Sequence, residues 1–308
     1  MKKIFLFCVI FTWCLTAEAQ QKLTVLLDWF ANPDHAPLII AKEKGFFTKH
    51  HLDVTLIGPA DPSDPPKLVA ASKADVAITY EPRFMMQVDQ GLPLIALGTL
   101  IDHPLDCLAV LQKSGITSIH DLKGKRIGYS GGQLNSIMLS TMLHHEKMSM
   151  SDIEHINVHY DLTQALLSEK VDAVTGVMRT LEVTQMTLAG KPARIFLPEK
   201  YGVPDYSELI YVINAKQKYD QRWTDFLAAI KEATRYLKQH PQKSWQLFIQ
   251  RYPAQKNQLN EKTWHATLPY FAKDPGYFNK DQWQRFQTFM LENKMIHHPL
   301  PIQGYFRG

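Results

Sequence analysis

The sequence is poor in cysteine, and the positions of its cysteines exclude whole classes of site. Of three cysteines in 308 residues, Cys8 and Cys14 lie within the first 19 residues, and only Cys107 lies in the body of the chain. One cysteine can form neither an internal disulfide nor a cysteine-rich metal centre. The body must therefore be stabilised by an apolar core, for which a hydrophobic content of 45% in a chain long enough for two lobes is sufficient.

Long hydrophobic runs are also missing, except at the N-terminus. Lys2 and Lys3 precede an apolar run over residues 4–15, which is followed by Ala17-Glu18-Ala19. The run is shorter than the roughly 20 residues of a membrane-spanning helix. Positive residues, a short apolar run and an A-x-A site are typical of a secretory signal. We expect residues 1–19 to be a signal peptide cleaved after Ala19, and the mature protein to be exported to the periplasm without stable membrane insertion.

Features of nucleic-acid binding, metal binding and hydrolysis are absent. The formal net charge is only +4 and the lysines are scattered, which disfavours a nucleic-acid partner. Three pairs of adjacent histidines occur: His50-His51, His144-His145 and His297-His298. Adjacent residues do not share a face of a helix or strand, so these pairs do not have the arrangement of a metal-binding pair. No G-x-S-x-G sequence occurs with suitable partners. We expect no metal, no cofactor and no catalytic residue.

What the chain has is an alternation of short apolar runs with helical patterns. Runs typical of buried strands occur at 23–27, 54–57, 74–78 and 94–97, and again at 107–111, 125–129, 156–158, 173–177 and 209–213. Helical patterns lie between them, including one over 37–47, and four more follow at 222–239, 242–249, 261–270 and 280–292. The alternation predicts two α/β units with parallel strands joined by helical crossovers, then a helical tail.

In open α/β sheets, ligands bind at loops beyond the carboxyl ends of the strands. Three such loops are expected at 28–35, 79–82 and 130–133. Two of them carry an aromatic ring beside a carboxylate, which suits a flat, nitrogen-rich ring that stacks and donates hydrogen bonds. The candidate ligand-binding residues on these loops are Asp28, Trp29, Asn32, His35, Tyr80, Glu81, Gly131, Gly132 and Gln133.

Each of these candidates also has a purely structural interpretation. In the structural interpretation, Trp29 is a core aromatic residue, and Asn32 and His35 are turn or capping residues. Glu81 is otherwise an acidic residue that favours the N-terminus of a helix. The Gly131-Gly132 pair either presents backbone N–H groups to an oxygen of the ligand or forms a tight turn.

Motifs spread along the chain resemble the NMT-type substrate-binding proteins. Leu27-Asp28-Trp29 with Asn32 and His35 is followed by AKEKGFF (41–47), DVAITYE (75–81), LKGKRIG (122–128) and VDAV (171–174). The stretch GVPDYSEL (202–209) resembles the ThiY branch of that family, which delivers formylaminopyrimidine, a thiamine precursor, to an ABC importer. The resemblance covers residues 23–270, and it rests on the order of the motifs more than on any one of them.

The resemblance implies a type II periplasmic-binding-protein fold, with two α/β lobes around a ligand cleft and a two-stranded hinge. Lobe I would be discontinuous, 20–110 plus 213–308, and lobe II would span 111–212, with hinges near Val110 and Val212. Closure of the lobes on the ligand would produce the form that the importer binds. The partners implied are a small pyrimidine and an ABC permease, and the protein is expected to be a monomer.

Three further candidates lie in the second unit and at the return crossing. Tyr206 would stack on the ligand and Glu208 would accept an amino-group hydrogen, unless both are surface turn residues. Arg179 lies three residues before Glu182, and the two either form an ion pair or line the cleft.

Other functions stay open at this point. One is transport of another flat heterocycle, such as a flavin, or of an alkylsulfonate; another is a ligand-sensing role beside a membrane receptor. A third is the fungal thiamine-pyrimidine synthase of the same family, which consumes a histidine and a lysine-bound pyridoxal phosphate. The resemblance places Thr79 at that lysine, Arg83 at that histidine, and the cysteine-free stretch 203–208 at the synthase's cysteine motif. We therefore expect a binding protein for formylaminopyrimidine or hydroxymethylpyrimidine, and not an enzyme.

Overall fold

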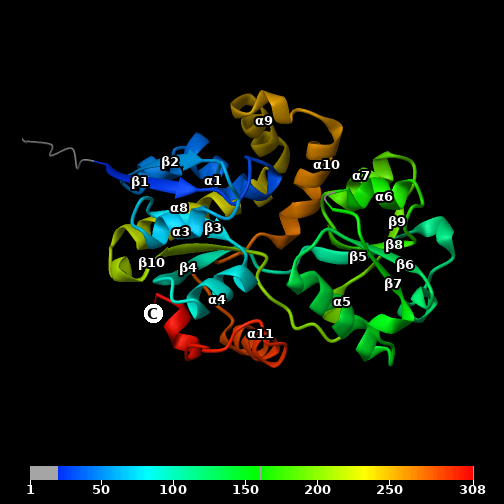
Figure 1. Cartoon of the computed structure of the whole chain (residues 1–308). Helices are drawn as coiled ribbons and strands as arrows, with labels where there is room; N and C mark the ends of the chain where they lie inside the picture. Colours follow the sequence, from blue (N-terminus) through cyan, green and yellow to red (C-terminus); the bar gives the residue numbers. More distant parts are fainter. Residues whose placement is uncertain (1–19, 160, 308) are drawn as a thin grey trace, which may run out of the picture.

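The computed structural model describes residues 20–159 and 161–307, and it contains two five-stranded sheets flanked by helices (Figure 1). Sheet A has the order β2-β1-β3-β10-β4 and sheet B the order β7-β6-β8-β5-β9. The expected α/β class is confirmed. The expected signal peptide, residues 1–19, lies outside the described residues.

The strands follow the expected apolar runs of the sequence, except for β9, where no run was expected. In sheet A they are β1 (Gln21–Leu26), β2 (Leu52–Ile57), β3 (Val76–Thr79), β4 (Leu94–Ile101) and β10 (Leu209–Asn214). In sheet B they are β5 (Asp106–Leu111), β6 (Arg126–Tyr129), β7 (Glu154–Asn157), β8 (Ala173–Met178) and β9 (Ala193–Phe196). Every residue of β3, β4 and β10 is buried, because helices cover both faces of sheet A.

Successive residues of each strand pack into different cores. In β10, Tyr211 and Ile213 face one core, whereas Ile210 and Val212 face the other. The first core of sheet A is covered by α1 (Ala36–Glu43), α2 (Phe46–Lys49), α8 (Arg222–Gln239), α9 (Pro241–Arg251) and α10 (Gln258–Thr267), and the second by α3 (Pro65–Ala70), α4 (Glu81–Asp89) and α11 (Lys280–Glu292). Sheet B has α5 (Gln133–His145) on one face and α6 (Leu162–Leu167) with α7 (Glu182–Leu188) on the other.

The predicted all-parallel arrangement is wrong for two strands. β10 runs antiparallel to β3 and β4, and β5 runs antiparallel to β8 and β9. Both are the first strand that the chain enters after crossing from the other sheet. Each crossing enters the new sheet at the edge where its parallel strands end, so Leu209 lies beside Ile101 and Asp106 beside Met178. A strand that enters at this edge must run against its neighbours.

The predicted helix over 37–47 is broken into two. Gly45 has φ 71°, in the left-handed region, and it separates α1 from α2. Glycine adopts this conformation without the steric penalty that a Cβ would add. The chain therefore turns there and α2 continues in a new direction.

The chain changes sheet between Ile101 and Asp106, and it returns between Phe196 and Leu209. All of β5 lies in sheet B, although the expected boundary at 110 assigns most of that strand to lobe I. In the described residues, no helix is long and apolar enough to cross a membrane. The same residues contain no cluster of three or more His, Cys, Asp or Glu that could hold a metal ion.

Candidate ligand-binding site

A cavity of about 560 Å³ lies where the carboxyl edges of the two sheets meet. Its volume is in the range of small-molecule sites, roughly 300–1,000 Å³. Sheet A and the loops after β1 and β3 supply Asp28, Trp29, Phe30, Ala31, Asn32, Pro33, Asp34, Tyr80 and Leu209. Sheet B and α7 supply Met178, Leu181 and Glu182, and the α10 region supplies Gln255, Asn260 and Thr263. The cavity is thus built from both halves of the molecule.

The loop after β1 is held by a capping box around a short 3-10 helix, Pro33–His35. The Asn32 side-chain oxygen accepts a hydrogen bond from the Asp34 N–H at 2.8 Å, and the Asn32 N–H donates to His35 Nδ1 at 3.3 Å. Reciprocal bonds of this kind satisfy the free N–H groups at a helix start. Asn32 therefore lines the cavity and also caps the helix, so both interpretations of this residue hold.

His35 is fully buried and positions the carboxylate of Asp28. Because His35 Nδ1 accepts a hydrogen bond, Nε2 carries the hydrogen that it donates to Asp28 at 2.8 Å. The hydroxyl of Tyr80 donates to the other oxygen of Asp28 at 3.1 Å. Burial opposes ionisation of Asp28, but the hydrogen bonds from His35 and Tyr80 hold its pKa below the ordinary value. The loops after β1 and β3 thus meet at one ionised carboxylate.

Two more carboxyl groups line the cavity, one from each half. Burial raises the pKa of Asp34 to about 6, and the charges of Asp28 and Glu182 add to the rise, whereas a hydrogen bond from Thr267 lowers it in part. Burial also raises the pKa of Glu182, whose Oε2 accepts the N–H of Met178 at 2.9 Å. Among the described residues that line the cavity there is no lysine or arginine. Its wall therefore offers hydrogen-bond acceptors and negative charge.

An exposed aromatic pair stands at the wall of the cavity. Trp29 is 51% exposed and Phe30 64%, and their rings meet edge to face with centroids 5.7 Å apart. A core aromatic would be buried, so Trp29 does not have that role. Apolar rings left in water beside a cavity are available to stack on a flat ligand.

Arg179 and Glu208 lie behind the cavity, at the crossings between the sheets. Arg179 forms a bidentate ion pair with Glu199 at 2.7 and 3.0 Å and not with Glu182, and it also donates to the carbonyls of Leu105 and Asp106. Glu208 accepts the N–H of Leu105 at 2.7 Å. Burial raises the pKa of Glu208 to about 8, and the nearby charge of Asp106 adds to the rise. These side chains hold the crossing segments together.

Glu81 and Tyr206 are buried beside the second crossing. Glu81 is the first residue of α4, and its Oε2 accepts the N–H of Ser207 at 2.7 Å. Burial raises the pKa of Glu81 to about 8. The ring of Tyr206 packs on Phe286 of α11, with centroids 4.8 Å apart. Both side chains tie the return segment to sheet A and lie outside the cavity wall.

The structure places the remaining candidates, Gly131, Gly132 and Gln133, at the N-terminus of α5. Gly131 and Gly132 have φ values of 100° and 89°, and all three residues lie outside the cavity wall. The loop forms a turn that glycine favours. Sequence reasoning missed Asn260 and Thr263, which reach the cavity from α10, about 230 residues beyond the first loop. No local pattern indicates such a contribution.

The architecture defines the class of protein. The structure superposes on the periplasmic aliphatic sulphonate-binding protein SsuA of Escherichia coli with a TM-score of 0.73 at 16% identity, covering 94% of this chain and 98% of that one. SsuA of Xanthomonas axonopodis, bound to MOPS, gives a TM-score of 0.69 at 15% identity, covering 94% of this chain and 99% of that one. The chain therefore has the periplasmic-binding-protein fold, as expected.

The sequence comparison then gives the family. The family model described as "NMT1/THI5 like" matches residues 32–244, and the chain belongs to this family. A Haemophilus influenzae protein whose name provisionally assigns it to thiamine biosynthesis is 42% identical over 94% of this chain and 93% of its own length. The formylaminopyrimidine-binding protein of Halalkalibacterium halodurans is 30% identical over 69% of this chain and 64% of its own length. A 4-amino-5-hydroxymethyl-2-methylpyrimidine phosphate synthase of Candida albicans is 29% identical over 88% of this chain and 83% of its own length.

Proposed function

We propose that this chain is the periplasmic binding component of an ABC importer, and that it binds an aminopyrimidine precursor of thiamine such as formylaminopyrimidine or hydroxymethylpyrimidine. The observation that carries the proposal is the cavity wall, in which the described residues combine an exposed Trp29 with three carboxyl groups and include no lysine or arginine. The names of the Haemophilus and Halalkalibacterium relatives support the same class of ligand.

The chemistry of the wall fits an aminopyrimidine. A flat ring stacks on Trp29, and its exocyclic amino group donates to a carboxylate, for which Asp28 is held ionised by His35 and Tyr80. Stacking contributes roughly 0.5–1.5 kcal/mol beyond the area buried, and each hydrogen bond to a charged group about 1.5–3 kcal/mol. A few such contacts reach the roughly 8 kcal/mol of micromolar binding.

The same wall disfavours an alkylsulfonate. A sulfonate is a permanent anion, and burying it beside Asp28, Asp34 and Glu182 without a lysine or arginine in the wall is electrostatically unfavourable. Likeness to the sulphonate-binding proteins supports the fold and not this ligand.

Transport requires that the cavity open and close. In the proposal, sheets A and B are the cores of two lobes, and the crossings at 101–106 and 196–209 are the hinges. Lobe closure buries the ligand, and the closed form is what the permease binds. The mature protein would be a periplasmic monomer, released by cleavage after Ala19.

The synthase activity of the fungal relatives is not proposed for this chain. At the position that the resemblance assigns to the pyridoxal-binding lysine, Thr79 is buried and has no amine. At the position of the consumed histidine, Arg83 donates to the carbonyl of Pro62 at 3.0 Å and its guanidinium lies 5.3 Å from the Tyr80 ring centre. Neither side chain can replace the lysine or the histidine chemically.

A thermal-shift panel tests the proposal. Residues 20–308 are mixed separately with formylaminopyrimidine, hydroxymethylpyrimidine, thiamine, riboflavin and ethanesulfonate. Ligand at 100 times its Kd stabilises a protein by about 2.7 kcal/mol, so a pyrimidine should raise the Tm clearly and ethanesulfonate should not. Stabilisation by ethanesulfonate or riboflavin alone would contradict the proposed ligand. Iron-dependent turnover of added pyridoxal phosphate would instead support the synthase.

A further inference from the structure

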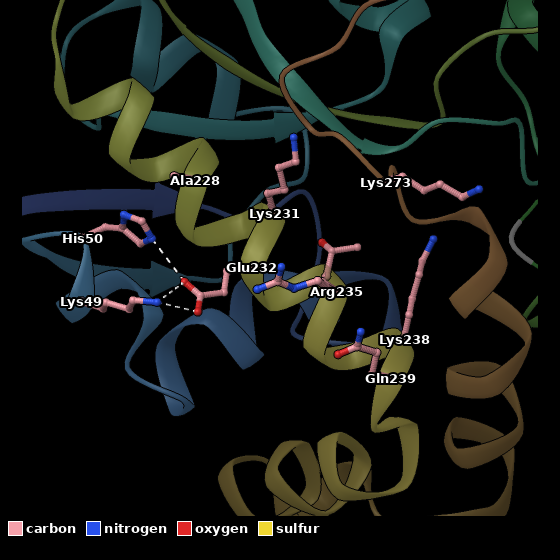
Figure 2. Close-up of a pocket in the computed structure, with 10 residues that line it drawn as sticks. Lys49, His50, Ala228, Lys231, Glu232, Arg235, Lys238, Gln239 and Lys273 are labelled. Carbon is pink, nitrogen blue, oxygen red and sulfur yellow. Dashed lines mark hydrogen bonds and ion pairs between the residues drawn. The ribbon is translucent and has the colours of Figure 1, made fainter.

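A second hollow lies on α8, and none of the described residues that line it also lines the ligand cavity. This groove has a volume of about 580 Å³ and is bounded by α2, by α8 and by the segment that carries Lys273 (Figure 2). Its wall is basic, because it carries Lys49, Lys231, Arg235, Lys238 and Lys273, together with His50. Five lysines and arginines in one groove are a strong concentration for a chain with a formal net charge of +4. We call this feature the basic groove.

Neighbouring carboxylates neutralise only part of the charge. Glu232, which is the one acidic residue among the described residues of the wall, is engaged by Lys49 at 2.8 Å and by His50 at 3.4 Å. Lys231 pairs with Asp274 at 2.6 Å. Arg235, Lys238 and Lys273 have no carboxylate partner among the described residues 20–159 and 161–307.

The end of the groove at Lys238 holds a cation that is only partly satisfied. The Lys238 ammonium donates to the carbonyl of Phe271 at 2.6 Å. Burial lowers its pKa, and the positive charge of Lys273 lowers it further, against the charge of Asp102. Figure 2 shows the two side chains at the same end of the groove, with Arg235 between this end and the Lys49–Glu232 pair. Two neighbouring ammonium groups repel each other, and an anion placed between them would remove the repulsion.

We propose that the basic groove is a second binding site, for a ligand that carries a phosphate group, with Lys238 and Lys273 as its anchors. A phosphate has several acceptor oxygens and up to two charges, so it can bond to both ammonium groups at once. Ala228 and the lysine stems provide apolar surface for the rest of the ligand. The phosphate can belong to a soluble phosphate compound or to a lipid headgroup. This site is separate from the proposed pyrimidine cavity and does not depend on it.

Two binding experiments with the mature protein, residues 20–308, distinguish the two sources. Calorimetry with inorganic pyrophosphate at low and high salt tests a soluble ligand. Co-sedimentation with phosphatidylglycerol vesicles, against phosphatidylcholine vesicles, tests a headgroup. Each experiment is repeated with the double variant Lys238→Gln/Lys273→Gln. The control is the double variant Lys113→Gln/Lys123→Gln, which has the same change in charge and alters two exposed lysines of the other half.

The proposal predicts saturable binding in one of the two experiments, weaker at high salt because the contacts are ionic. Loss of two charge-assisted bonds should weaken it about tenfold or more. The control pair should bind as the unmodified protein does, and unchanged melting temperatures would show that both variants fold. Absence of binding to both probes, or equal binding by the groove variant, would overturn the proposal.

Discussion

The N–H of Leu105 donates to the carboxyl group of Glu208 at 2.7 Å, and this bond joins two segments that are 103 residues apart in sequence. Leu105 lies where the chain leaves sheet A, and Glu208 lies where it returns. The N–H of Ser207, one residue earlier, donates to Glu81 of α4 in the same way. Buried carboxyl groups therefore fasten the crossings beside the ligand cavity.

The stability of the protein should fall as pH rises from 5 to 8, partly through Glu208. Its folded pKa of about 8 lies above the ordinary value, about 4.3. A raised folded pKa gives stability that is fully present below the ordinary value and is lost as pH rises through about 8. Glu208→Gln keeps an oxygen for Leu105 but cannot ionise, so it should be more stable than the unmodified protein at pH 8, by roughly 1–3 kcal/mol.

Urea unfolding at pH 5 and pH 8 checks this prediction. The exposed Glu292→Gln on α11 is the matched control and should show the pH dependence of the unmodified protein. If Glu208→Gln lost the same stability as the control between the two pH values, Glu208 would not be the group that titrates.

Loss of His35 should be strongly destabilising. His35→Ala removes the Nε2 hydrogen bond to the buried carboxylate of Asp28 and the acceptor for the Asn32 N–H. Leaving a buried carboxylate without its hydrogen-bond donor costs about 1–3 kcal/mol or more, and denaturant unfolding at pH 7 measures the loss. The exposed His265→Ala on α10 should change stability by less than about 0.5 kcal/mol. Equal stabilities of the two variants would show that His35 does not support the loop.

Pyrimidine affinity should depend on pH through Asp34. Because burial raises its pKa to about 6, the group passes from neutral to ionised between pH 5 and pH 7 and becomes a better acceptor. We expect affinity to rise several-fold over this range by calorimetry. Asp34→Asn should reduce the rise, whereas protonation of the ligand itself would affect both proteins equally. An unchanged pH profile in Asp34→Asn would exclude Asp34 from the binding site.

The strands and the long helices could be predicted from the sequence because their apolar patterns are strong. The pattern over 222–239 gives the bounds of α8 as the structure has them. By contrast, α7 has only one buried residue, Met186, and β9 is short and half-buried, so neither has a pattern to detect. Strand direction was wrong for β5 and β10 because an apolar run has the same appearance in either direction.

The cavity-lining residues were predictable mainly where they directly follow a strand. Asp28, Trp29, Asn32 and Tyr80 follow strands β1 and β3, and the rule that ligands bind beyond strand ends places them correctly at the cavity wall. Tyr206 was placed near the crossing, but a sequence does not say that its ring packs on Phe286. For Glu182, the alternative of lining the cleft is the one that the structure has, whereas Asn260 reaches the cavity through tertiary packing of α10, which leaves no local signal.

The central claim is tested most directly by calorimetric titration of residues 20–308 with formylaminopyrimidine, for the unmodified protein and for Trp29→Ala. We expect one-to-one binding at micromolar Kd or tighter, weakened about tenfold or more in Trp29→Ala because stacking and buried apolar area are lost. Tyr277→Ala, which removes another exposed aromatic ring (67% exposed) outside the cavity, should bind as the unmodified protein does. Absence of binding to the pyrimidine would contradict the proposed ligand. Equal binding by Trp29→Ala and the unmodified protein would contradict the proposed site.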